Sequence, residues 1–170
     1  NVPVDEQFIF NFKRNGGKFL YCDSSNEVKE QFENILEEND WFESEALCFE
    51  LTLFSMLKEN NIFFDKPQDP KFLLATCENL VSDEGSISFS SNQIKQKKPN
   101  ELPVNMVIIA HTSQIISGKS EILSAIKNKY KKEYPSNITT IKYFEKAQEE
   151  DFTQYGSAAK NLYLILLEDL

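Results

Sequence analysis

Residues 80–91 carry the clearest pattern of apolar and polar positions in the chain. An acidic turn, Asp83-Glu84-Gly85, leads into strict alternation, with Ile87 and Phe89 on one face and serines on the other. A two-residue period of this kind predicts a half-buried strand. Gly85 is the position in the turn where a positive φ costs least. The segment therefore brings two carboxylates and several hydroxyls to one turn, where polar chemistry can take place.

Apolar residues spaced three or four apart predict four helices. The first covers residues 3–14, where alternating phenylalanines also permit a strand. The second follows a capping box that Ser24 forms with Glu27. The third and fourth cover residues 50–60 and 120–134.

Shorter apolar runs predict the strands. Residues 104–110 are apolar and β-branched, which indicates a buried central strand, and residues 162–167 form a second buried strand. The other predicted strands cover residues 19–22, 45–49, 62–64, 80–82, 86–90 and 138–144. Residues 71–77 are ambiguous, residues 91–103 indicate a polar loop, and residues 148–160 are poorly patterned.

Strands that alternate with helices predict a single α/β domain over residues 1–170. The expected architecture is a three-layer sandwich with a mostly parallel mixed sheet and helices on both faces. Ligands of such sheets bind beyond the carboxyl ends of the strands. The segments expected there are residues 22–24, 49–50, 82–85 and 111–113. We therefore expect the turn at Glu84 and the strand end at His111 to open into one cleft.

The composition argues against several classes of protein. A net charge of −9 over 170 residues disfavours nucleic-acid binding, which needs a basic surface. No apolar run approaches about 18 residues, so we expect no membrane-spanning helix. Three widely spaced cysteines indicate reduced thiols in the cytoplasm. A single histidine excludes a histidine-rich metal site, and no glycine-rich nucleotide motif occurs. We expect no metal or cofactor, and the oligomeric state stays open.

Five segments follow one another in an order that is typical of one family. They are residues 15–19, 77–82, 83–87, 104–111 and 162–168. Residues 82–86, Ser-Asp-Glu-Gly-Ser, are close to that family's central Ala-Glu-Thr-Gly-Ser/Thr motif. The chain thus resembles a divergent LUD domain, the family of lactate-utilisation accessory proteins of the LutC/YkgG type. The resemblance implies a fold similar to the NagB/RpiA/CoA-transferase superfamily.

The resemblance also implies a function. LUD proteins look like components of an iron–sulfur and flavin-linked lactate-oxidising system. We therefore expect an accessory or small-anion-binding protein of carboxylate metabolism, with a small carboxylate or phosphate as ligand. The family's late Gly-Pro-Ser-Lys/Arg-Thr-Ala-Asp-Ile-Glu segment is missing from residues 139–150, and residues 155–157 keep only a glycine. This loss favours binding without turnover.

Two alternatives and a set of site residues complete the expectation. The protein is alternatively an enzyme acting on a sugar phosphate or CoA ester, with Glu84 as base or nucleophile, because CoA-transferase relatives use a glutamate beside glycine. It is alternatively an interaction subunit of an iron–sulfur/flavin oxidoreductase complex. The expected ligand-binding residues are Asp83, Gly85, Ser86, Lys95, Lys98, His111 and Thr112. The competing interpretation is structural: a solvent-facing turn, a hydrogen-bonded histidine and solvated lysines.

Overall fold

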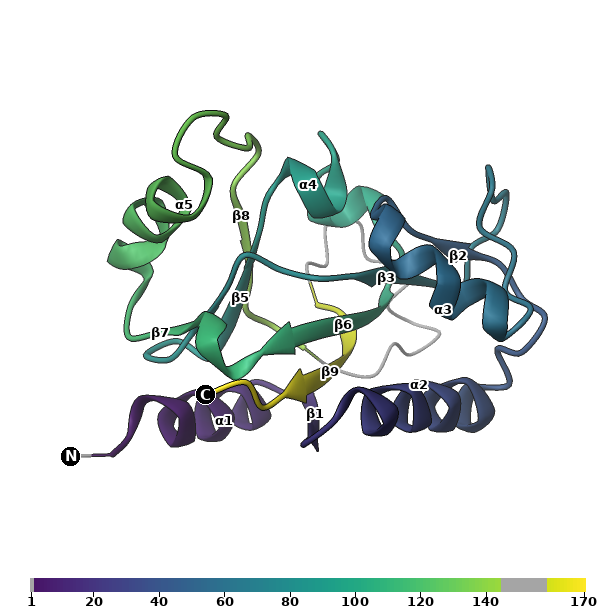
Figure 1. Cartoon of the computed structure of the whole chain (residues 1–170), viewed down its shortest axis with the longest axis horizontal. Helices are drawn as coiled ribbons and strands as arrows, with labels where there is room; N and C mark the ends of the chain where they lie inside the picture. Colours follow the sequence, from purple (N-terminus) through teal and green to yellow (C-terminus); the bar gives the residue numbers. More distant parts are fainter. Residues whose placement is uncertain (1, 145–158) are drawn as a thin grey trace.

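The computed structural model describes residues 2–144 and 159–170, and this part of the chain forms two β-sheets surrounded by helices (Figure 1). The helices are α1 (Val4–Arg14), α2 (Ser25–Asn39), α3 (Phe54–Glu59), α4 (Ser91–Ile94) and α5 (Ile122–Tyr130). The strands are β1 (Lys18–Cys22), β2 (Ala46–Leu47), β3 (Phe72–Ala75), β4 (Asn79–Val81), β5 (Ser86–Phe89), β6 (Asn105–His111), β7 (Ile115–Ile116), β8 (Thr139–Ile141) and β9 (Asn161–Leu167). Short 3₁₀-helices lie at Leu51–Leu53, Pro99–Glu101, Thr112–Gln114 and Lys119–Glu121.

The main sheet is parallel throughout its described strands, in the order β1-β9-β6-β3-β2. At its centre β6 pairs with β9 from Asn105 opposite Asn161 to His111 opposite Leu167. Both strands are buried along nearly their whole length, as their apolar sequences predict. The predicted α/β fold with a mostly parallel sheet is confirmed.

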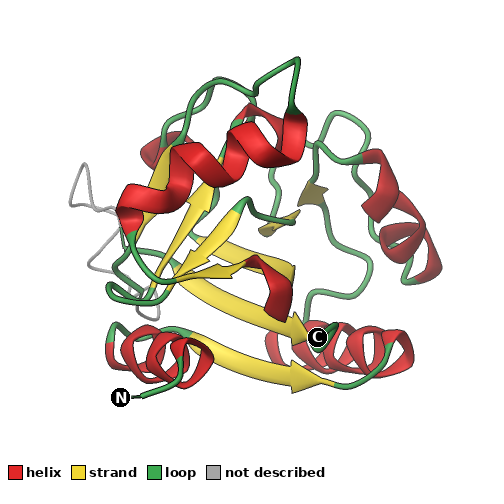
Figure 2. Cartoon of the chain, turned by 60° about the vertical axis from the view of Figure 1, so that its left-hand side comes forward, coloured by secondary structure: helices red, strands yellow, loops and turns green. Residues whose placement is uncertain are grey.

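Alternation along the central strands builds the layers on either side of the main sheet. Met106, Ile108 and Ala110 of β6 enter a core shared with α1 and the second sheet. Val107 and Ile109 enter a core shared with α2 and α3. Successive strand residues point to opposite faces, so a strand that is apolar at every position needs cover on both. The elements therefore stack in three layers, with the main sheet in the middle (Figure 2).

One outer layer differs from the prediction, because it is mainly a second sheet with strand order β7-β4-β5-β8. β4 and β5 form its antiparallel hairpin, in which Val81 lies opposite Ser86. Val81 packs against Ile122 and Ile126 of α5, so α5 covers the outer face of this sheet. The prediction that β5 is half-buried is wrong, because its serines lie on that covered face and are fully buried.

Other elements confirm or correct the sequence pattern locally. Residues 4–14 are helical, so the strand alternative for this segment is wrong. Residues 62–64 were predicted as a strand but form only one isolated bridge, between Phe63 and Glu45. The ambiguous residues 71–77 contain β3. The predicted loop at 91–103 contains α4. Expectations for residues 145–158 lie outside the described residues.

The acidic turn between β4 and β5 rests on the C-terminal half of α1. The side-chain amide of Asn11 donates to the carbonyl oxygen of Ser82 at 2.9 Å, and that of Asn15 donates to the carbonyl oxygen of Glu84 at 2.7 Å. Gly85 has a φ of 66°, and a Cβ atom there would lie 2.4 Å from the carbonyl carbon of Asn11. The turn thus needs glycine for its backbone angle and for its close approach to α1.

Gly85→Ala is expected to lower the free energy of unfolding by at least about 2 kcal/mol. The left-handed backbone alone costs an alanine about 1–2 kcal/mol, and the clash with α1 adds to this. Gly118→Ala is the matched control, because its φ is −150° and its nearest new neighbour would be the Asp83 side chain at 3.1 Å. Urea denaturation measures both variants, and equal losses for the two would contradict the special role of Gly85.

Lys160 is buried at the start of β9, with 2% of its surface exposed. Its Nζ donates to the carbonyl oxygen of Leu102 at 3.0 Å. Burial lowers the pKa of Lys160 from 10.5 to about 8. The charged ammonium therefore destabilises the fold at neutral pH.

We expect the free energy of unfolding to rise as pH increases from about 8 to 10.5. In this window the unfolded chain still binds the Lys160 proton and the folded chain does not. Lys160→Met should abolish the rise and stabilise the protein at pH 7 by up to about 3 kcal/mol. The exposed Lys58 provides a control, Lys58→Met. Denaturation curves at pH 7, 8, 9 and 10 test this, and an unchanged pH slope in Lys160→Met would refute it.

Candidate ligand-binding site

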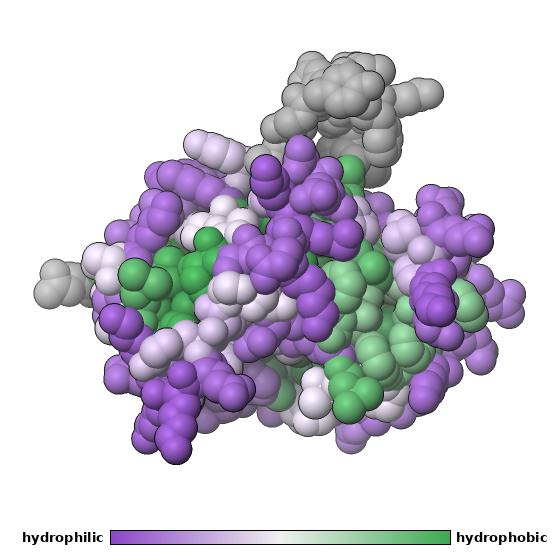
Figure 3. Space-filling model, turned by 90° about the horizontal axis from the view of Figure 1, so that it is seen from above, coloured by the Kyte–Doolittle hydropathy of each residue, from purple (hydrophilic) through white to green (hydrophobic). Residues whose placement is uncertain are grey.

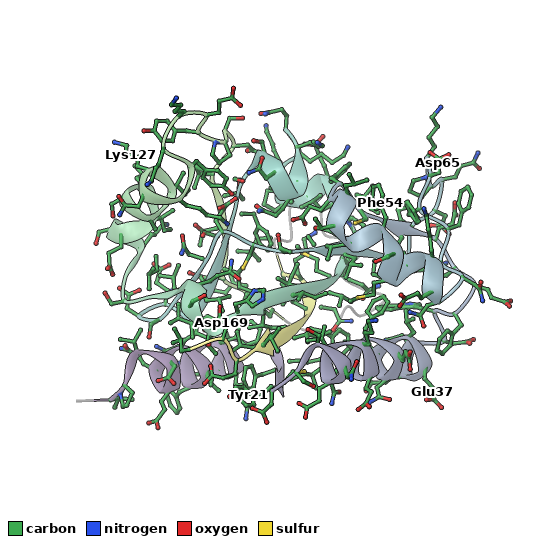
Figure 4. All side chains as sticks on the ribbon, viewed as in Figure 1. Tyr21, Glu37, Phe54, Asp65, Lys127 and Asp169 are labelled. Carbon is green, nitrogen blue, oxygen red and sulfur yellow. The ribbon has the colours of Figure 1, made fainter. Side chains whose placement is uncertain are left out.

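A cavity of 690 Å³ lies at the carboxyl edge of the main sheet, between the strand ends and α5. Its volume falls in the usual range for small-molecule sites. Asp169, which follows β9, marks this edge in Figure 4. The lining residues are Thr76, Cys77, Glu78, Asn79, His111, Ser113, Gln114, Ile116, Ala125, Asn128, Lys129 and Asp169.

Glu78 is a buried carboxylate in the wall of the cavity, with 3% of its surface exposed. The hydroxyl of Ser90 donates to its Oε2 at 2.6 Å, and the amide of Gln93 donates to the same atom at 2.9 Å. The hydroxyl of Tyr130 reaches both carboxylate oxygens, at 2.8 and 2.9 Å. The Nζ of Lys129 lies 3.7 Å from Oε1. Buried charges need such partners, and Glu78 thereby joins the loop after β3 to α4 and α5.

The Glu78 network also sets the charge state of its α5 partners. Burial and the hydrogen bond to Glu78 raise the pKa of the Tyr130 phenol, so it stays a donor. Burial alone lowers the pKa of Lys129, but the charge of Glu78 and the contact with Tyr130 raise it above its ordinary value. Lys129 is therefore a fixed cation beside the cavity, with its side chain 55% exposed.

Gln114 holds the strand ends around the cavity in place. Its Nε2 donates to the carbonyl oxygens of Cys77 at 2.7 Å and Glu78 at 3.2 Å. Its Oε1 accepts from the backbone N–H of His111 at 2.8 Å, and its own carbonyl oxygen accepts from Asn79 at 3.1 Å. One amide thus fixes the end of β6 against the loop between β3 and β4.

Asp169 forms the other acidic side of the cavity. Its carboxylate accepts from the backbone N–H of Ser113 at 2.8 Å, from the Ser113 hydroxyl at 2.6 Å and from the Thr112 hydroxyl at 2.9 Å. These bonds, the Ser113 hydroxyl first, lower the pKa of Asp169. Thr112 also donates to Glu168. The chain after β9 is therefore tied to the end of β6 with its carboxylate ionised.

A third carboxylate lies behind this wall. Glu50 accepts hydrogen bonds from the backbone and the hydroxyl of Thr76. Burial raises the pKa of Glu50, and the Thr76 bonds only partly oppose this. The predicted strand-end segment at residues 49–50 therefore does reach the carboxyl edge, through Thr76.

The structure separates the residues that were expected to share one cleft. His111 lines the cavity, and Thr112 is buried directly behind it. Asp83, Glu84, Gly85 and Ser86 lie outside the cavity, at the end of the hairpin that rests on α1. The expected convergence of the turn with His111 is wrong, because β4 runs away from the cavity in the second sheet and the turn follows its far end.

The two lysines expected at the site are exposed near α4 and do not line the cavity. Lys95 follows the last residue of α4, and Lys98 precedes the 3₁₀-helix at Pro99–Glu101. The hydroxyl of Ser86 donates to the Glu84 side chain at 3.1 Å. A ligand-binding role for the two lysines, or for the residues of the acidic turn, stays a prediction.

Sequence reasoning missed most of the cavity lining, although two signals were present. Residues 71–77 were ambiguous, and assigning them to a strand would have placed Glu78 just past its carboxyl end. The same rule applied to β9 would have found Asp169. No local signal distinguishes Lys129 from the neighbouring Lys127, Lys131 and Lys132.

Other chemistry has little support in this part of the chain. Cys22, Cys48 and Cys77 are buried free thiols, and burial raises the pKa of Cys48 to about 11. Within residues 2–144 and 159–170, no three His, Cys, Asp or Glu side chains gather as metal ligands would. No helix in these ranges has the length and hydrophobicity that crossing a bilayer requires.

Comparison with known proteins supports the fold. No family model and no curated protein sequence matches the chain. A DUF162 family protein from Deinococcus radiodurans has a similar structure, with a TM-score of 0.65 over 96% of both chains at 13% sequence identity. DUF162 is the LUD domain family. The chain therefore shares the fold of this DUF162 protein, and a shared fold carries no activity with it.

Glu78→Gln is expected to lower the free energy of unfolding by about 2–4 kcal/mol. Glutamine replaces one carboxylate oxygen by an NH₂ group, which is itself a donor. The buried donors of Ser90, Gln93 and Tyr130 then share one fewer acceptor atom. Glu84→Gln is the matched control and should change stability by less than about 0.5 kcal/mol, because its carboxylate lies at a partly exposed turn. Thermal and urea denaturation distinguish the two, and similar effects at both positions would count against the Glu78 network.

Proposed function

We propose that this protein is a LUD-like domain that binds a small organic anion, a carboxylate or a phosphate, in the cavity at the carboxyl edge of the main sheet. In this proposal it acts as an accessory component of carboxylate metabolism and does not require turnover. The observation that carries the proposal is Lys129, a cation held by the buried Glu78 beside a cavity of 690 Å³.

The donors around Lys129 support an anionic ligand. Lys129 has three N–H groups, and its contact with Glu78 at 3.7 Å is longer than a hydrogen bond. Asn128 and His111 add donors to the same lining. A small anion bound next to Lys129 would therefore contact an ammonium group that still has N–H groups to donate, with neutral donors nearby.

The acceptors on the opposite side support a ligand that also donates. Asp169 and the side chain of Asn79 belong to the same lining and offer oxygen atoms that accept hydrogen bonds. A hydroxyl group one or two bonds from the carboxylate would pair with such acceptors. A small hydroxy acid has both groups, which agrees with the lactate-type chemistry that the family resemblance implies.

A second candidate is an interaction subunit of an iron–sulfur or flavin oxidoreductase. It is favoured by apolar side chains exposed over the end of the molecule that carries α3 (Figure 3). Leu51 is 79% exposed and Phe63 is 56% exposed. Co-purification with a flavin or iron–sulfur protein that is lost in Leu51→Glu would support this candidate.

Isothermal titration with lactate, pyruvate, sugar phosphates and acyl-CoAs tests the leading proposal. We expect at least one small anion to bind, and Lys129→Met to weaken it at least about tenfold through loss of a charge-assisted contact. Lys127→Met on the exposed side of the same helix is the matched control and should leave affinity unchanged. Absence of binding by every compound, or equal losses in both variants, would reject the cavity as an anion site.

The enzyme alternative uses Glu84 as base or nucleophile. Glu84→Gln should then abolish turnover of a sugar phosphate or CoA ester and leave the fold intact. Because Glu84 lies outside the cavity, ligand binding there should not change in this variant.

A further inference from the structure

The side chains that line the cavity carry a net negative charge. Among the described lining residues, Lys129 is the one lysine and there is no arginine, whereas Glu78 and Asp169 are both carboxylates. With His111 neutral, the lining carries a formal charge of −1. Any anion that binds therefore shares one cation with Glu78 and faces a second carboxylate.

Neither carboxylate can readily move away from the ligand. Glu78 is held by three donors, of which Ser90 and Gln93 come from the N-terminus of α4 and Tyr130 from α5. Both oxygens of Asp169 are engaged by the segment after β6, through Thr112 and Ser113. The geometry therefore fixes both negative charges at the site.

A further carboxylate lies close to each of Glu78 and Asp169, and it makes the electrostatic potential at the cavity more negative. Glu168 accepts from Thr112, next to Asp169. Glu50 is close enough to interact with both Glu78 and Lys129. A second negative charge on a ligand would meet this field without a second cation to neutralise it.

We propose that the cavity selects ligands with a single negative charge, and that Asp169 is the residue that rejects a second one. This inference rests on the proposed anion site and narrows its ligand to a monocarboxylate that carries a neutral or cationic donor group, such as a hydroxyl or an ammonium. Phosphorylated ligands are disfavoured by charge. Volume does not exclude them, because 690 Å³ accommodates a phosphorylated three-carbon acid.

Glycerate and 3-phosphoglycerate form the test pair, because they share a carboxylate and a hydroxyl and differ by one phosphate. We expect titration calorimetry at low salt to give a glycerate affinity at least about tenfold higher, the size of one partly screened charge contact. Asp169→Asn should bring the two affinities closer by on the order of tenfold. Asp65→Asn removes an exposed carboxylate outside the cavity and should leave the ratio unchanged.

The outcomes separate this inference from the anion site itself. If 3-phosphoglycerate binds the wild-type protein as well as glycerate does, or if Asp65→Asn changes the ratio as much as Asp169→Asn, the inference is wrong and the anion site stands. If neither acid binds, and lactate, pyruvate, sugar phosphates and acyl-CoAs fail as well, the proposed function and this inference both fall. A salt titration of the wild-type protein gives the same answer should Asp169→Asn not fold, because added salt should weaken the discrimination.

Discussion

The neutralisation of Glu78 is the constraint on which the arrangement around the cavity depends. A carboxylate with 3% exposure in this position needs several donors, and the chain supplies them from Ser90, Gln93, Lys129 and Tyr130. These residues come from two segments, 90–93 and 129–130, that lie far apart in the sequence. Satisfying one charge therefore brings α4, α5 and the loop after β3 to the same place, and the cavity lies between α5 and the strand ends.

The apolar layers explain why this polar junction can exist at all. β6 and β9 are buried on both faces, by α2 and α3 on one side and by α1 and the second sheet on the other. α5 is attached to the second sheet through the smaller cluster around Val81, Ile122 and Ile126. The contacts of Tyr130 and Lys129 with Glu78 supplement this limited apolar contact. They also fix which residues of α5 face the strand ends.

The sequence predicted what depends on local pattern and missed what depends on pairing over long distances. The helical period around Phe8 and Phe12 and the apolar run at residues 104–110 were sufficient to place α1 and β6. The alternation at β5 was also correct, but no local signal shows that α5 covers its serine face. Partner choice in a sheet is set by tertiary packing, so nothing near residues 82–85 revealed that the hairpin belongs to a second sheet. The expected convergence of the turn with His111 failed for that reason, since His111 ends a strand of the main sheet whereas Glu84 follows a strand of the second sheet.

The redundancy of donors on Glu78 has a consequence for how the cavity fills. When an incoming molecule draws Lys129 toward itself, Ser90, Gln93 and Tyr130 still solvate the glutamate. In the proposed binding the wall would therefore keep its shape, and association would spend little free energy on rearrangement. Such a preorganised pocket behaves as a rigid receptor, whose partners are chosen by fit and not by induced closure.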